Sequence, residues 1–166
     1  MQWSSKMHRT SFKVTCRLLC VVFLIGFQAN GAASMTTDTN NIEAWLEQYK
    51  RSWQQQDPDL VATLFTENAR YAVNPLEHVL NGRAEIRAYW NAGGSGSQKN
   101  INFEYEIWSV TAEMVIVHWT ASFTRTKTGE HVKMDGVFRL IFAPLENGGL
   151  ICSTLEEWWF LAVAEP

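Results

Sequence analysis

The sequence predicts an α+β fold in which helices cover one side of a curved antiparallel sheet. Three observations support this prediction. Apolar residues recur at helical spacing in three segments within residues 40–91. Strand-like alternation then fills most of residues 101–161. Turns containing glycine, at residues 127–130 and 147–149, separate the later strands and indicate a meander of four strands.

The first helix is expected at residues 40–56, where the apolar residues fall on one face. Asp57 and Pro58 favour the start of a second helix, because aspartate caps free N–H groups and proline fits the first turn. A short strand follows at residues 69–73 and ends at Asn74 and Pro75. The third helix is expected at residues 83–91.

Residues 132–142 read as a long central strand of the sheet. Their even-numbered side chains are apolar and their odd-numbered ones mostly polar, which indicates one buried face and one wet face. Gly136 interrupts the apolar face and suggests a bulge or a bend. A final strand is expected at residues 150–161. A sheet that curves in this way wraps around either a core or a pocket.

Residues 1–33 have the pattern of a secretory signal peptide. Basic residues precede an apolar run at residues 18–27, and small residues follow it. The run is too short for a comfortable transmembrane helix. Met35 offers an alternative translation start. The protein is thus expected to be secreted or periplasmic if the signal is real, and cytoplasmic if translation starts at Met35. The folded domain is expected at residues 40–161.

The charge of the folded part limits its classes of binding partner, and its cysteine content limits disulfide formation. Without the first 34 residues, 10 basic residues face 17 acidic ones, which argues against nucleic acid or an anionic membrane as a partner of the folded part. Cys152 is the single cysteine after the signal, so no intramolecular disulfide is expected. Its apolar neighbours favour a place in the core.

Several stretches resemble the nuclear transport factor 2-like superfamily and its SnoaL-like branch. They are WLEQYKRSWQQQDPDLVATLFTENARY, NGRAEIRAYW, FEYEIWSV, VHWTASFTR, MDGVFRLIF and LEEWW. The resemblance implies a cone-shaped antiparallel sheet wrapped by three N-terminal helices, with a pocket inside and often a homodimer through the sheet. The superfamily holds isomerases, dehydratases, cyclases, hydrolases and binding domains, so it does not select one activity.

Ketosteroid isomerase is the sharpest chemical comparison within that superfamily. Its reaction uses a carboxylate base and an oxyanion hole made of a tyrosine and a protonated aspartic acid. The resemblance places Tyr49 at the tyrosine, Asn74 at the base and Phe138 at the acid. An amide and a phenyl ring cannot exchange protons at neutral pH. Steroid isomerisation is therefore not expected, unless a bulge at Gly136 turns Asp135 inward.

The expected pocket is apolar and aromatic, because the chain contains eight tryptophans. Candidate lining residues are those that periodicity or the resemblance directs inward: Tyr49, Trp53, Tyr71, Asn74, Trp90, Trp119, Phe138 and Trp158. Each alone fits a packed core, but together they favour a cavity. Tyr49 fits equally well a donor to a ligand oxygen and a core residue with a satisfied hydroxyl.

Glu156 is the main candidate proton carrier beside Tyr49. It shares strand parity with Trp158, so we expect it to face inward and Glu157 to face outward. Burial there would raise its pKa and allow acid or base chemistry. Asp135 is a further candidate through the bulge.

His78 follows Glu77 in a loop near the expected pocket mouth, where an acid and an imidazole can move protons, but a solvated loop pair is the favoured interpretation. His118 alternates with Trp119 and is expected on the outer sheet face. No histidine spacing indicates a metal site, and no cofactor motif is found.

Two classes of function remain. The first is a domain that binds a small apolar molecule without catalysis. The second is a small-molecule isomerase, lyase or hydrolase that uses Tyr49 with a pocket carboxylate. A third, an interaction module that pairs through the outer sheet face, involves Trp108 and His118.

Overall fold

The computed structural model describes residues 39–93 and 96–164. The expected signal peptide lies outside these residues. The helices are α1 (Thr39–Gln55), α2 (Pro58–Thr63) and α3 (Gly82–Gly93). The strands are β1 (Phe65–Ala72), β2 (Val79–Asn81), β3 (Gln98–Val110), β4 (Val115–Arg125), β5 (His131–Pro144) and β6 (Leu150–Ala164). No helix in this part of the chain is long and apolar enough to cross a membrane.

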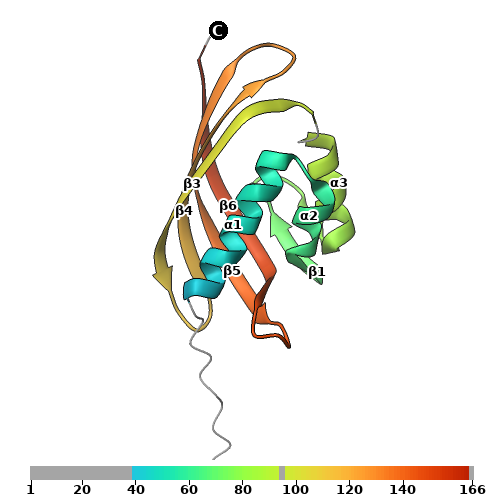
Figure 1. Cartoon of the computed structure of the whole chain (residues 1–166), viewed down its shortest axis with the longest axis vertical. Helices are drawn as coiled ribbons and strands as arrows, with labels where there is room; N and C mark the ends of the chain where they lie inside the picture. Colours follow the sequence, from blue (N-terminus) through green and yellow to red (C-terminus); the bar gives the residue numbers. More distant parts are fainter. Residues whose placement is uncertain (1–38, 94–95, 165–166) are drawn as a thin grey trace, which may run out of the picture. The chain divides into compact units, whose positions relative to one another are not determined.

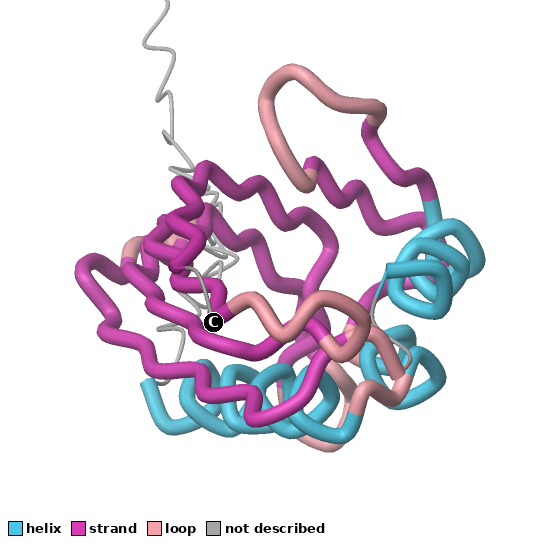
Figure 2. The backbone as a smooth tube through the Cα atoms, turned by 90° about the horizontal axis from the view of Figure 1, so that it is seen from above, coloured by secondary structure: helices cyan, strands magenta, loops and turns pink. Residues whose placement is uncertain are grey.

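The six strands form one open sheet in the order β2-β1-β6-β5-β4-β3. Neighbours are antiparallel except β1 and β6, which are parallel. The three helices lie on one side of the sheet (Figure 1), and the strands form a curved wall when seen from above (Figure 2). The predicted α+β fold, with helices on one face of a curved sheet and a closing meander, is confirmed.

Hydrogen bonds of two side chains, Asp57 and Trp45, help to hold the helices in place. The Asp57 side chain accepts hydrogen bonds from the backbone N–H groups of Asp59 and Leu60, both at 3.0 Å, and so caps α2 as expected. The Trp45 indole on α1 donates to the carbonyl oxygen of Leu64, at 2.9 Å. This bond fixes α1 against the end of α2, and the apolar face of α1 is buried on the sheet.

Gly136 does not form the expected bulge. It pairs in regular register with Trp119 on β4 and Trp159 on β6. A Cβ atom at this position would lie 2.6 Å from Cζ2 of Trp119 and 2.8 Å from the carbonyl oxygen of Trp158. The glycine is therefore required because the Trp119 ring packs directly on the β5 backbone. Since the register is unbroken, Asp135 stays on the outer face, 3.2 Å from Nε2 of His118.

The irregularity of the central strands lies further along. The register between β5 and β6 shifts between Ile141 and Phe142, whose partners are Thr154 and Cys152. Ser153 is thus the additional residue on β6, which is the arrangement of a β-bulge. Even-numbered Cys152 is buried before the shift, whereas odd-numbered side chains are the buried ones after it.

We expect Gly136→Ala to lower the free energy of unfolding by about 1–3 kcal/mol, because the methyl group meets both a ring and a backbone oxygen. Chemical denaturation measures this loss. Gly93→Ala is the matched control, since nothing lies within 4 Å of a Cβ atom there. Equal stability of the two variants would contradict the close packing of Trp119 on β5.

Candidate functional site

A cavity of about 220 Å³ lies among side chains of the helices and the inner sheet face. Its wall includes Tyr49 and Trp53 from α1, Trp90 from α3, Tyr71 from β1, Trp119 from β4 and Glu157 from β6. The aromatic rings hold one another in place through edge-to-face contacts, such as those of Trp53 with Trp90 and with Trp119. The cavity is smaller than most ligand sites.

Glu157 is the one charged residue among the buried positions that the structure describes, with 7% of its surface exposed. The Tyr71 hydroxyl donates a hydrogen bond to Oε1 of Glu157 at 2.9 Å. The hydroxyl oxygens of Tyr49 and Tyr71 are 3.1 Å apart. Because Tyr71 donates to the carboxyl group, its oxygen is left to accept from Tyr49, and the three side chains form a continuous hydrogen-bonded chain.

Burial is the largest influence on the pKa values of these three hydrogen-bonded side chains. Desolvation raises the pKa of Glu157 to about 8, although the hydrogen bond from Tyr71 opposes the rise and the nearby Glu77 carboxylate adds to it. Burial, and then the charge of Glu157, raise the pKa values of Tyr49 and Tyr71 well above 10. The tyrosines therefore remain protonated donors, while Glu157 changes charge close to neutral pH.

The comparisons with known proteins identify the family. Residues 46–153 match the SnoaL-like domain family.

The chain belongs to the SnoaL-like domain family.

No curated protein matches the sequence of this SnoaL-like domain. Solved structures with the nuclear transport factor 2-like fold are similar to it. A putative scytalone dehydratase from Novosphingobium aromaticivorans aligns with a TM-score of 0.66 at 16% identity, over 77% of this chain and 87% of that one. A hexachlorocyclohexane dehydrochlorinase, type 2, gives 0.63 at 10% identity, over 76% and 88%. A Δ5-3-ketosteroid isomerase from Mycobacterium sp. gives 0.59 at 17% identity, over 75% and 98%. At such identities the likeness concerns the fold.

Five of the eight expected lining residues of the SnoaL-like domain surround the cavity: Tyr49, Trp53, Tyr71, Trp90 and Trp119. Three do not. Phe138 is fully buried behind the wall, with its ring centroid 5.4 Å from that of Tyr49. Asn74 accepts a hydrogen bond from the backbone N–H of Leu76 at 2.9 Å and so shapes a turn. Trp158 points away from the cavity and is 45% exposed.

The expected orientations of the two glutamates are reversed. Glu156 lies on the outer face, where it pairs with Arg139 at 2.8 Å and with Arg70. Glu157 lies inside, because the bulge at Ser153 exchanges the two faces of β6. A glutamate therefore enters the cavity as expected, but it is Glu157 and not Glu156. Sequence alternation missed Glu157 for this reason, and it also missed Tyr89 and Trp159 of the wall.

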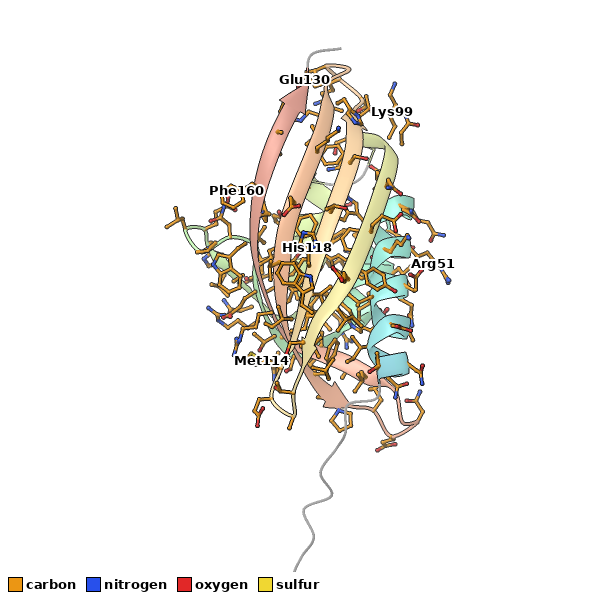
Figure 3. The ribbon with its side chains drawn as sticks, turned by 90° about the vertical axis from the view of Figure 1, so that its left-hand side faces the viewer. Arg51, Lys99, Met114, His118, Glu130 and Phe160 are labelled. Carbon is orange, nitrogen blue, oxygen red and sulfur yellow. The ribbon has the colours of Figure 1, made fainter. Side chains whose placement is uncertain are left out.

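The other candidate proton carriers lie elsewhere. Asp135 and His118 face each other on the outer sheet surface, and His118 stacks on Trp108 with centroids 4.7 Å apart. Figure 3 looks onto this surface and labels His118. His78 is highly exposed and pairs with Glu85 at 3.7 Å. Among residues 39–93 and 96–164, no group of three or more acidic, histidine or cysteine side chains is placed to hold a metal ion.

Replacing Glu157 should change how stability depends on pH. An unfolded glutamate loses its proton near pH 4.5, but the folded one near pH 8, so the folded state holds an extra proton between these values. Stability then falls as pH rises across this window, by up to about 1.4 kcal/mol per pH unit. We expect Glu157→Gln to remove this fall.

Urea denaturation at pH 5, 6, 7 and 8 measures the effect. Glu156→Gln is the matched control, since its carboxylate is partly exposed and paired with arginines, and it should retain the fall. A parallel pH dependence in the native protein and Glu157→Gln would contradict the buried, protonated carboxyl group.

Proposed function

We propose that this SnoaL-like domain binds a small, largely apolar organic molecule in the aromatic cavity and transfers a proton on it, as an isomerase or a lyase. The observation that carries the proposal is the buried Tyr49–Tyr71–Glu157 chain in the cavity wall. A group whose pKa lies near the working pH can both give and take a proton, which is the requirement for general acid–base catalysis.

In this proposal each of the three hydrogen-bonded side chains has its own role. Glu157 is the proton carrier, because Oε2 makes no hydrogen bond with another described residue and is left for the substrate. When Glu157 is ionised, the hydrogen bond from Tyr71 stabilises its charge. Tyr49 holds the Tyr71 hydroxyl in position from the opposite side. The aromatic wall excludes water and binds the apolar part of the molecule.

The similar structures support this class of reaction as the first to test. Their names denote a dehydratase, a dehydrochlorinase and an isomerase. Elimination and isomerisation each require that a proton be removed from or returned to the substrate. The non-catalytic alternative shares the cavity and differs only in whether Glu157 exchanges a proton with the bound molecule.

Exchange of carbon-bound hydrogen in 2-tetralone tests the proposal without knowledge of the natural substrate. This neutral two-ring ketone has protons beside its carbonyl group, and their replacement by deuterium in D₂O is followed by NMR. We expect the protein to accelerate the exchange, with a rate that rises as pH passes about 8, since the ionised form of Glu157 is the base.

Glu157→Gln should reduce the acceleration about 100-fold or more, whereas Glu156→Gln, on the outer face, should leave it unchanged. Binding of 2-tetralone without accelerated exchange would contradict the proton-transfer role and leave a binding site. Absence of binding by 2-tetralone and its methoxy and alkyl derivatives, measured by calorimetry, would contradict both parts.

We also propose that the outer sheet face pairs with a second copy of the chain. Its exposed aromatic side chains support this: Phe160 is 84% exposed and Trp108 is 55% exposed. Phe160 and His118 are both labelled in the view onto this face (Figure 3). Exposed aromatic side chains on one face are a common feature of interaction sites.

Phe160→Glu should shift the protein toward the monomer in light scattering coupled to gel filtration, because it places a charge in the contact. Leu76→Glu is the matched control: Leu76 is 95% exposed but lies in the loop before β2. A monomeric native protein at 100 µM, a concentration chosen as about 100 times a micromolar dissociation constant, would contradict the pairing.

A further inference from the structure

Four indole side chains line the cavity, and they differ in whether the indole N–H has a hydrogen-bond acceptor. Trp53 donates its N–H to the side-chain oxygen of Gln98 at 2.8 Å, and Trp159 donates to the carbonyl oxygen of Val73 at 2.9 Å. The N–H groups of Trp90 and Trp119 are buried and have no acceptor among the described residues. The more deeply buried pair is thus the pair without hydrogen bonds.

This arrangement reverses the usual pattern in proteins. A buried N–H group without an acceptor is destabilising, and nearly all such groups have a partner. Here two unpartnered donors occur in one cavity wall, on rings that are 92% and 99% buried. The rings of Trp53 and Tyr49 pack edge-to-face against them, and the Tyr49 hydroxyl bonds to Tyr71 and not to an indole N–H.

We propose that Trp90 and Trp119 form a second polar contact in the cavity, which binds a hydrogen-bond acceptor such as an ether or carbonyl oxygen on a neutral ligand. The inference rests on the proposed function and specifies its substrate class. The acceptor is distinct from the group that meets Glu157, because neither indole N–H bonds to the tyrosine chain.

The remaining wall chemistry favours a neutral ligand. Among the described residues that line the cavity, none is lysine, arginine or histidine, so an anion would find no counter-charge. A cation would meet Glu157, but a cationic group has no lone pair to accept a hydrogen bond from either indole N–H. Because both indole nitrogens are covered in the unliganded protein, neighbouring groups must move to admit the acceptor as the ligand binds.

Pairs of 2-tetralone derivatives test the inference with the full chain. Each pair carries either a methoxy or an ethyl group at position 5, 6 or 7, so the two members match in size and differ in the acceptor oxygen. Ethyl is the more apolar group, and apolar contact alone would favour it. We expect the methoxy member of the best pair to bind about three- to tenfold more tightly by calorimetry.

Two substitutions should remove this preference. Trp90→Phe and Trp119→Phe each delete one donor, and the ratio of the two affinities should fall toward one. Trp159→Phe is the matched control, because its N–H already bonds to Val73, and the ratio should persist. Comparing a ratio cancels the change in cavity size that each substitution causes.

A spectroscopic measurement on the native protein keeps the test valid if a variant fails to fold. In ¹⁵N-labelled protein, two indole N–H signals should move downfield with the methoxy ligand and not with the ethyl one. Equal affinity of the members of every pair, with unmoved indole signals, would overturn the inference. So would tighter binding of a trimethylammonium-substituted 2-tetralone than of the methoxy compounds. Either result can coexist with hydrogen exchange that depends on Glu157, so the proposed function is tested separately.

Discussion

The hydrogen bond from Tyr71 to Glu157 is the interaction on which the site depends. Burial of a carboxyl group among aromatic rings is unfavourable unless the group is neutral or receives hydrogen bonds. Tyr71 supplies the bond, and Tyr49 supplies the next one in turn. Glu157 is therefore held between two charge states: burial favours the acid, and the tyrosine favours the carboxylate. Both the neutral and the ionised form of Glu157 are therefore accessible near neutral pH.

The position of that carboxyl group follows from one extra residue in β6. The bulge at Ser153 exchanges the two faces of the strand, so that Glu157 enters the cavity and Glu156 meets Arg70 and Arg139 outside. Both glutamates are then accommodated by their surroundings, one by a hydroxyl group and one by two guanidinium groups. β-Bulges commonly redirect side chains at functional sites. In this domain the bulge determines which of two adjacent glutamates enters the apolar wall.

Three of the expected residues that line the cavity lie on elements with regular periodicity. Tyr49 and Trp53 follow from the helical spacing of α1, and Trp119 follows from β4, whose register with β5 has no shift. Glu157 could not be predicted, because the segment LEEWWFL has large apolar residues on both faces and so does not show which face is buried. Gly136 was ambiguous for another reason: a glycine in a strand indicates either a bulge or a close approach, and alternation cannot separate them. The Trp119 ring decides the matter in three dimensions.

The same contacts explain why proteins of similar fold need not share a catalytic mechanism. The positions that the resemblance linked to an acid and a base hold Phe138 and Asn74, one packed behind the wall and one shaping a turn. The carboxyl group of this cavity comes instead from β6, beside a different tyrosine. Function in this fold depends on which strand brings its polar group inward.

The most direct test of this account is the titration of the Glu157 side-chain carboxyl carbon by ¹³C NMR in protein labelled at glutamate, with Glu157→Gln used to assign the signal. The buried, tyrosine-bonded carboxyl group should give a midpoint near pH 8. A midpoint near 4.5, the ordinary value for glutamate, would contradict it.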